Sequence, residues 1–233
     1  MSRSYGQYCG LARALDVVGD RWNLLIVRQL LIAPARYREL LDGLGGMATN
    51  LLTDRLRDLE TAAVVERRLA EEGNAIVYAL TPWGAELREP IESLIRWSTP
   101  LMARGPGGDR FHSEWLAVGL RALLADRAAA HQASTVGIAV DGRLLQVRAT
   151  RSGTEVTLHD GGDLDAVVRA DAPVILGLAA GALTLDDTHG LVDIEGDEAT
   201  VRALFDSRRA HAGESTRRDN VTVPAKLRKR SDA

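Results

Sequence analysis

Cysteine is almost absent from this 233-residue sequence, and Cys9 is the only one. A single cysteine cannot form an internal disulfide, which is typical of proteins in a reducing compartment. Long apolar runs are absent too, because no stretch reaches the roughly 20 residues that a membrane-spanning helix needs. The N-terminal residues contain no apolar segment of the kind found in secretion signals. We therefore expect a cytoplasmic protein without a membrane partner.

The residue patterns that mark metal sites and catalysis are also missing. The five histidines, at positions 112, 131, 159, 189 and 211, show no metal-ligand spacing. No Ser-His-Asp arrangement, phosphate-binding loop or dinucleotide fingerprint is present. We therefore expect no enzymatic activity, no metal and no cofactor. Because Cys9 has no second cysteine or base nearby, a buried structural thiol is favoured over a redox switch, which stays the alternative.

The net charge of −3 conceals three segments of different charge. Residues 1–104 contain 13 basic and 13 acidic residues, residues 105–207 contain 8 and 16, and residues 208–233 contain 8 and 3. Because the first segment has no net charge, it has no general attraction to a polyanion. Only the arrangement of charged residues on its surface can favour binding of nucleic acid. The acidic middle segment should lie away from any duplex.

Apolar periodicity predicts four helices in the first 61 residues. The expected helices are 9–18, 20–30, 36–41 and 49–61. Asp20 can cap the second helix, Pro34 follows it, and Gly43 with the Gly45-Gly46 pair should end the third. In the fourth helix the apolar residues fall on one face and small polar or charged residues on the other.

A hairpin and a long helix are expected next. Two β-rich runs, 64–69 and 75–80, flank the polar segment Glu71-Glu72-Gly73-Asn74. Thr81 and Pro82 should then begin a single helix that continues to Met102. Helices followed by an arginine-bearing hairpin are typical of a winged helix-turn-helix, which presents one helix to the major groove and the hairpin to the flanking backbone.

The sequence pattern changes after a Gly- and Pro-rich linker at 105–110. The expected elements are helix 111–130, strands 136–140, 145–149, 156–158 and 164–170, helix 171–181, strand 191–195 and helix 197–205. Asp141 and Gly142 predict a tight turn between the first two strands. Five strands with three helices make an independent domain over 111–210, and the basic tail 211–233 is expected to be disordered.

A set of motifs runs in order through the first hundred residues. They are Cys9, Ala12-Arg13-Ala14-Leu15, Gly19-x-Arg21-Trp22, Leu25-Ile26-x-Arg28-x-Leu30, Tyr37-Arg38-Glu39-Leu40, Leu52-Thr53-x-Arg55-Leu56-Arg57-x-Leu59-Glu60 and Val77-Tyr78-x-Leu80-Thr81-x-x-Gly84. On these motifs the first hundred residues resemble the HxlR-type branch of bacterial winged-helix regulators, which are relatives of the MarR regulators. The resemblance implies a DNA-binding domain over 1–104 that dimerises through its first helix and the helix after the hairpin. The family often has glycine where this chain has Ala63.

Three parts of the second half form a recognisable pattern of turns: 164–171, a helix with Gly177 and Gly181, and 190–197. On this pattern the second half looks like a sterol carrier protein-like lipid-binding domain. The likeness implies an α+β protein with an apolar tunnel between a five-stranded sheet and its helices. Ordinary core packing is the alternative for every residue that would line the tunnel. The candidates are Trp115, Leu116, Leu145, Val147, Ile175 and Leu178.

The helix expected at 49–61 carries the strongest candidates for base contacts, which are Thr49, Asn50, Thr53 and Arg57. Asparagine suits adenine and arginine suits guanine, whereas Arg55 lies nearer the buried face and would reach phosphate. A solvated helix face is the alternative. Additional backbone candidates are Arg36, Arg38, Arg67, Arg68 and Asn74. Since Arg67 and Arg68 alternate on a strand, at most one of them should face DNA.

The sequence therefore predicts a transcription regulator, expected to be a repressor, that binds a pseudo-palindromic operator in double-stranded DNA as a homodimer. An apolar effector bound in residues 111–207 would shift the dimer geometry. The apolar helix after the hairpin could instead pack against the second domain. Two rival functions stay open: a lipid or metabolite carrier in which the winged helix serves dimerisation, and a regulator whose second domain is an oligomerisation scaffold.

Overall fold

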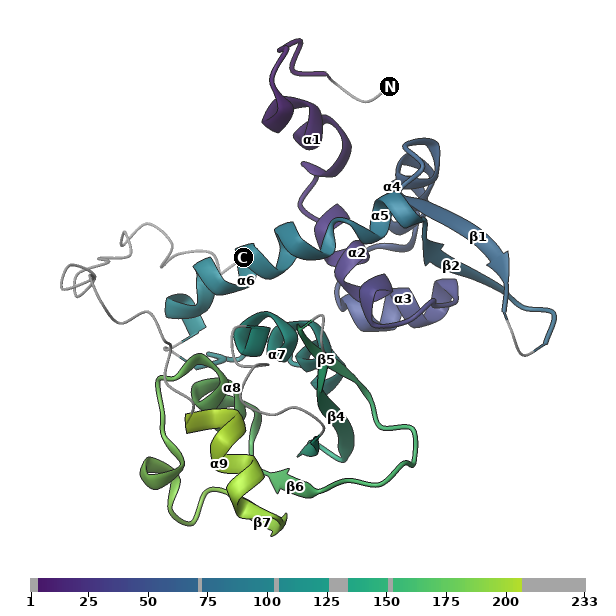
Figure 1. Ribbon diagram of the computed structural model, residues 1–233. Coiled ribbons are helices and arrows are strands. Elements are labelled where there is room, and N and C mark those ends of the chain that lie inside the picture. The colour runs from purple at the N-terminus through teal and green to yellow at the C-terminus, as the bar shows by residue number, and fades with distance from the viewer. Residues whose placement is uncertain (1–3, 71–72, 103–104, 126–133, 151–152, 207–233) are drawn as a thin grey trace.

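The computed structural model describes residues 4–70, 73–102, 105–125, 134–150 and 153–206 (Figure 1). Its first half contains α1 (Gly10–Val18), α2 (Asn23–Ile32), α3 (Tyr37–Leu44), α4 (Thr49–Thr61), β1 (Val65–Leu69), β2 (Ile76–Leu80), α5 (Pro82–Ala85) and α6 (Arg88–Met102). The predicted helix at 49–61 and the hairpin after it are confirmed. We call the β1–β2 hairpin the wing.

Buried leucines fix α4 in place. Leu52, Leu56 and Leu59 are at most 1% exposed and belong to one apolar cluster with Ile26 of α2 and Leu40 of α3. Their spacing of three and four residues puts them on one side of α4, so the opposite side is free for polar side chains.

The wing is joined to the segment between α2 and α3. Its two strands are antiparallel, with Val65 opposite Leu80. Ala35 forms an additional bridge to Tyr78, with N–H to carbonyl distances of 3.0 and 2.8 Å in the two directions. This bridge, which the periodicity did not reveal, ties the base of the wing to the start of α3.

Several predicted helix boundaries are wrong, including the start of the helix expected from 111, where the α-helix begins only at Leu116. The helix expected from 81 to 102 is divided into α5 and α6, with α6 beginning at Arg88. This start places Pro90 in the first turn, where its missing N–H removes no helical hydrogen bond. The third helix continues through Gly43 to Leu44, so Gly43 does not end it, whereas Gly45 caps it as expected, with a φ of +48°.

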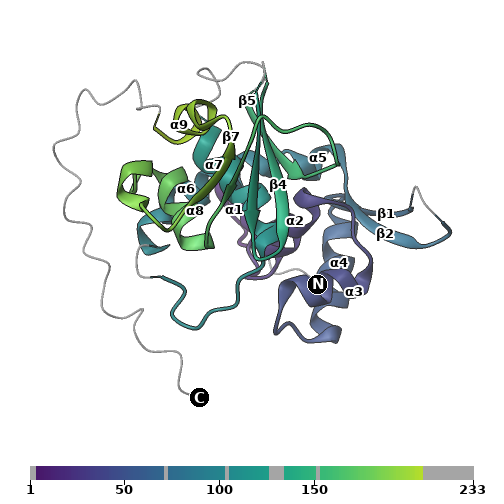
Figure 2. The ribbon, with the colours of Figure 1, turned by 90° about the horizontal axis from the view of Figure 1, so that it is seen from below.

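The second half forms a mixed sheet covered on one face by helices (Figures 1 and 2). Its elements are η1 (Ser113–Trp115), α7 (Leu116–Leu124), β3 (Thr135–Val140), β4 (Arg143–Thr150), β5 (Gly153–Leu158), β6 (Ala166–Arg169), α8 (Ala172–Ala180), η3 (Leu185–Thr188), β7 (Asp193–Gly196) and α9 (Glu198–Asp206). All five predicted strands are present, in the order β5-β4-β3-β6-β7. Only the β3–β6 pair is parallel within the described sheet.

Local signals in this half are confirmed as well. Asp141 and Gly142 have φ values of +48° and +74°, as the predicted tight turn requires. Gly181 ends α8 in the left-handed region. The part of the expected first helix at 126–130 lies outside the described residues, as does the tail 211–233. The short helix η3 was not predicted.

Helix α7 contributes to the buried clusters of both halves. Val118 belongs to the cluster of the first half, whereas Leu116, Leu120 and Leu124 belong to that of the second. α7 also packs along α6 (Figure 1). Among the described residues, no helix combines the length and apolar character that crossing a membrane requires.

Candidate nucleic-acid interface

The polar side of α4 is exposed beside the wing. Thr49, Asn50, Thr53 and Arg57 all lie on this exposed side. Arg57 is 3.5 Å from Asp54, but both side chains are more than half exposed. Such a surface ion pair contributes at most about 1 kcal/mol, so it does not prevent Arg57 from contacting a phosphate or a base.

A tyrosine that the sequence analysis did not single out holds the first turn of α4. The Tyr37 hydroxyl on α3 donates to the Thr49 carbonyl at 2.6 Å and lies 3.2 Å from Thr53 Oγ1. These contacts fix the angle between α3 and α4. The sequence signal that could have predicted this contact is a tyrosine at the start of one helix followed by threonines at the start of the next.

Arg55 braces α4 from the other side. Its guanidinium is 3.3 Å from Asp20 and 3.4 Å from Asp58, and the side chain is partly buried. Asp20 also accepts a hydrogen bond from the Trp22 N–H at 3.0 Å, in the turn before α2. Phosphate contact by Arg55 stays a prediction, and its ion pairs make it a positioning residue for α4.

Two arginines at the start of α3 are exposed. The backbone N–H of Arg36 donates a hydrogen bond to the Glu39 carboxylate at 2.7 Å, which caps the helix. Arg38 is exposed two residues further on. Both side chains are accessible to a phosphate backbone that passes the start of α3.

The wing arginines point to opposite faces. Arg67 is paired across the hairpin with Tyr78 and lies 3.1 Å from Glu60 of α4, while Arg68 is opposite Val77. Burial and the nearby Glu60 carboxylate raise the pKa of the Tyr78 phenol. Arg68 has no ion pair with any described residue, so it is the freer of the two for phosphate.

Asn74 is exposed at the tip of the wing, beside Gly73, whose φ is +89°. The neighbouring positions 71 and 72 lie outside the described residues. Asn74 is thus available to contact a flanking backbone.

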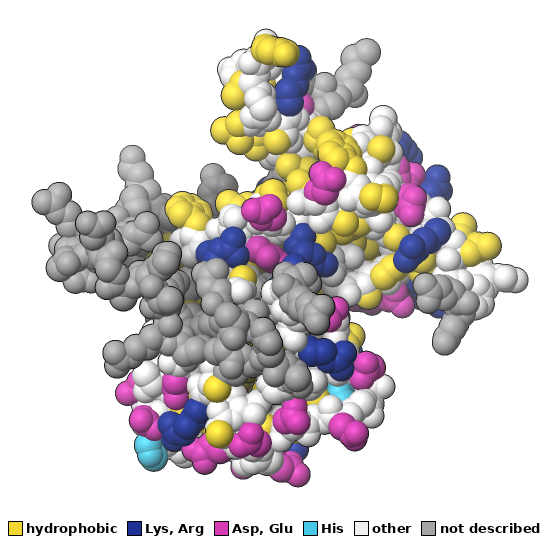
Figure 3. Space-filling view, viewed as in Figure 1, with side chains coloured by type: hydrophobic (Ala, Val, Ile, Leu, Met, Phe, Trp, Pro, Cys, Tyr) yellow, Lys and Arg dark blue, Asp and Glu magenta, His cyan; other side chains and the backbone are white. Residues whose placement is uncertain are grey.

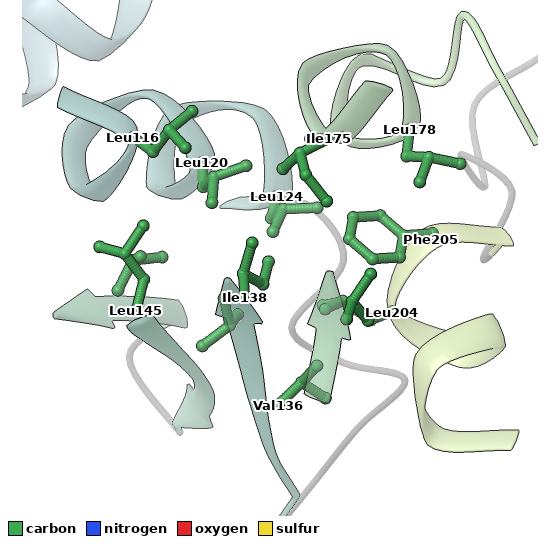
Figure 4. Close-up of a cluster of buried hydrophobic side chains, with 14 of the residues drawn as sticks. Leu116, Leu120, Leu124, Val136, Ile138, Leu145, Ile175, Leu178, Leu204 and Phe205 are labelled. Atoms are coloured by element: carbon green, nitrogen blue, oxygen red, sulfur yellow. The ribbon is translucent and has the colours of Figure 1, made fainter. Parts of the chain in front are cut away.

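Five of the six candidate ligand residues form part of one buried core (Figure 4). They are Leu116, Leu145, Val147, Ile175 and Leu178, each at most 2% exposed. Trp115 lies outside that cluster and faces α2. A hollow of about 200 Å³ with mostly polar lining lies near the β3–β4 turn, between Phe111, His112, Ser113, Glu114, Asp141 and Arg143.

Exposed apolar side chains cover α1 and the outer side of α6, as Figure 3 shows. The opposite side of α6, with buried Ile91 and Glu92, packs against α7. Packing of this helix against the second half is therefore observed for one face, and dimerisation through the exposed face stays a prediction. We call the exposed set the apolar strip; it consists of Leu11, Leu15, Leu94, Trp97, Leu101 and Met102.

The expected burial of Cys9 is wrong. Cys9 is exposed and immediately precedes α1. Backbone N–H groups of Ala12 and Leu11 stabilise the thiolate and lower the pKa of the thiol. Cys9 is exposed because it lies at the start of a helix that protrudes from the rest of the molecule, and not because of its residue type.

Acidic side chains are spread over the visible face of the second half (Figure 3). The described residues contain no group of three or more His, Cys, Asp or Glu side chains arranged to hold a metal ion. The arginines that are candidates for DNA contact lie on the other half of the molecule, which carries α4 and the wing.

Comparison with known proteins matches the same half. A family described as HxlR-like helix-turn-helix matches residues 17–105. The HTH-type transcriptional regulator YodB of Bacillus subtilis is 31% identical over 86 residues, which are 36% of this chain and 77% of YodB. The uncharacterized HTH-type regulator sll1512 of Synechocystis is 34% identical over 84 residues, which are 36% of this chain and 62% of that protein.

The solved structures that are similar to this chain cover less than half of its length. The quinone-bound YodB of B. subtilis has 28% sequence identity and a TM-score of 0.35, covering 39% of this chain and 96% of that structure.

Proposed function

The chain belongs to the HxlR-like helix-turn-helix family, and we propose from this that it is a transcriptional regulator that binds double-stranded DNA sequence-specifically. The observation that carries the proposal is the two-sided α4. Leu52, Leu56 and Leu59 bury one side, and Asn50 and Arg57 occupy the exposed side beside a wing. A helix presented in this way can enter a major groove and contact base edges.

The active form in this proposal is a homodimer joined through the apolar strip. Leu11 is 68% exposed and Trp97 is 76% exposed, which is costly for side chains of this size in water. A two-fold dimer would place two copies of α4 in successive major grooves, so the operator would be pseudo-palindromic.

We further propose that the regulator is a repressor that responds to an apolar effector in its second half. The acidic second half would stay away from DNA and leave α4 as the reading element. Because five of the candidate ligand residues pack against one another, binding would require this core to open between α7, α8 and the sheet. A ligand that stabilises the open arrangement would change the geometry of the dimer.

Gel-shift titration tests the DNA proposal, with the upstream intergenic duplex and a scrambled duplex of the same composition. We expect tighter binding to the intergenic duplex and a steep loss of affinity with salt. Equal and weak binding to both duplexes would reject the proposal and leave the carrier function. Repeating the titration with lipids and aromatic metabolites tests the effector, and affinity unchanged across that panel would reject it.

A further inference from the structure

One side chain of the second half reaches into the helix-turn-helix. Trp115, at the end of η1, donates a hydrogen bond from its Nε1 to Gln29 Oε1 of α2 at 3.2 Å. Gln29 is only 8% exposed, although its amide is polar. Because a buried amide is costly when its hydrogen bonds are lost, this contact fixes the position of the Gln29 side chain.

Gln29 in turn lies directly against α3. A Cβ atom at Gly43 would be 3.0 Å from both Cδ and Nε2 of Gln29, so a side chain there would press on the amide. Gly43 is in the last turn of α3, two residues before the Gly45 turn that leads to α4. The amide of Gln29 thus separates Trp115 from the end of α3.

The Trp115 ring also contacts an arginine of α2. The Arg28 guanidinium lies 4.0 Å from the centre of the Trp115 ring. Burial lowers the pKa of Arg28 to about 10, and its Nε finds no hydrogen-bond partner among the described residues. The contact of this guanidinium with the indole face favours one position of the ring.

A second contact from this segment reaches the turn between α3 and α4. Arg110, which precedes η1, has its Nη1 3.2 Å from where a Cβ at Gly45 would lie. The segment that enters the second half therefore contacts both α2 and the turn between α3 and α4.

Two polar contacts between the halves lie away from this turn. Arg121 of α7 pairs with Glu92 of α6 at 2.7 Å, and Arg96 donates to the Ala122 carbonyl at 3.2 Å. These contacts hold α7 on α6 and do not involve α3 or α4. They provide a control for loosening the contact between the halves without moving Gln29.

We propose that Trp115 and Gln29 are positioning residues for DNA reading, through which the second half sets the placement of α3 and hence of α4. The inference rests on the proposed function. It also gives the second half a route to the DNA-reading element that does not depend on the dimer interface. Displacing the indole would free the Gln29 amide, and the end of α3 would lose its fixed spacing from α2.

Three variants of the full chain test this proposal. Trp115→Phe keeps an aromatic ring under Arg28 but removes the N–H donor. Gly43→Ala pushes on Gln29 from the opposite side, at a helical position where alanine would otherwise add stability. Arg121→Gln removes the α6–α7 ion pair and serves as the control.

We expect Trp115→Phe and Gly43→Ala each to reduce the ratio of operator to scrambled-duplex affinity about fivefold, a typical size for coupling through packed side chains. Arg121→Gln should lower thermal stability and leave that ratio unchanged. Equal effects of Trp115→Phe and Arg121→Gln on the ratio, or no effect of Trp115→Phe, would overturn the proposal.

A measurement without DNA separates this proposal from the proposed function. Amide hydrogen exchange across residues 44–53 should be faster in Trp115→Phe than in the wild type, and unchanged in Arg121→Gln. If the wild type fails to distinguish the operator, the proposed function is rejected while the exchange data still decide the contact. Unchanged exchange in Trp115→Phe would contradict the positioning role.

Discussion

Ala63 has a backbone conformation that disfavours its own side chain. It lies two residues after the end of α4, with a φ of +56°, and its carbonyl accepts a hydrogen bond from Thr81 Oγ1 at 2.6 Å. The left-handed region costs a residue with a Cβ about 1–2 kcal/mol. The resemblance had marked this position, because related regulators often have glycine there.

We therefore predict that Ala63→Gly raises the free energy of unfolding by about 0.5–1 kcal/mol, since relief of the strain exceeds the added freedom of the unfolded chain. Urea denaturation measures the change. Ala62→Gly is the matched control: its φ is −80°, so glycine should destabilise there. Equal destabilisation by both substitutions would contradict this account.

The exposure of single residues was harder to predict from the sequence than the positions of helices and strands. The pattern identified Thr49, Asn50 and Arg57 as exposed because helical periodicity alone separates them from the buried leucines. It did not identify Cys9 as exposed, or Tyr37 as a contact to α4. Both depend on distances between elements, which no local period encodes.

At the scale of elements, the α3–α4 contact predicts an effect of removing one oxygen. Tyr37→Phe deletes the hydroxyl that donates to the Thr49 carbonyl. We expect a loss of about 1 kcal/mol in the free energy of unfolding, as for a typical hydrogen bond, and weaker operator binding. Chemical denaturation and gel shift measure these effects. Tyr8→Phe, at a fully exposed tyrosine, is the control and should change neither quantity.

The start of α9 predicts a dependence on pH. Hydrogen bonds from Thr200 Oγ1 and the Ala199 N–H lower the pKa of the Asp197 carboxyl below its ordinary value of 3.8. The folded state therefore binds a proton less readily than the unfolded state. The stabilisation is present above pH 3.8 and is lost as the pH falls through the lower folded-state pKa.

Thermal unfolding of Asp197→Ala and the wild type between pH 7 and pH 2 tests this dependence. The difference between their melting temperatures should be largest near neutral pH and should shrink below pH 3.8. A difference that stays constant over the whole range would show that the carboxylate charge contributes nothing to the cap.

Element types were predictable where one local rule acted alone. Period-two alternation identified the strands of the second half, because one sheet face is buried under helices. The break between α5 and α6 was not predicted because Thr81 and Pro82 give a strong signal for one helix start, although Pro90 favours a second start in the first turn of α6. The Ala35–Tyr78 bridge joins distant segments, so no window of sequence contains it.

The apolar strip makes a prediction for the whole molecule. Trp97→Asp places a charge on a side chain that is 76% exposed, so the folded protomer should tolerate it. In a dimer the same charge would be buried without a partner, and we expect a monomer with weaker operator binding. Sedimentation or light scattering measures the mass. Leu191→Asp, at an exposed leucine of the second half, should leave the oligomeric state unchanged.

A dimer that persists in Trp97→Asp would contradict the proposed interface.

The glycines at 105–110 predict a division of the chain there. The shared use of α7 was not predictable, because Val118 and Leu120 look equally apolar in sequence although they join different clusters. Assignment of helix faces to partners is decided by packing in three dimensions.

The affinity of Asn50→Ala/Arg57→Ala for the upstream duplex tests the central claim most directly. We predict a loss of about 1–3 kcal/mol of discrimination for each base contact removed, with a smaller change on the scrambled duplex. Arg202→Ala, which removes an exposed arginine from the acidic half, is the matched control and should bind as the wild type does. Wild-type affinity for the operator in the double variant would contradict the assignment of α4 as the DNA-reading helix.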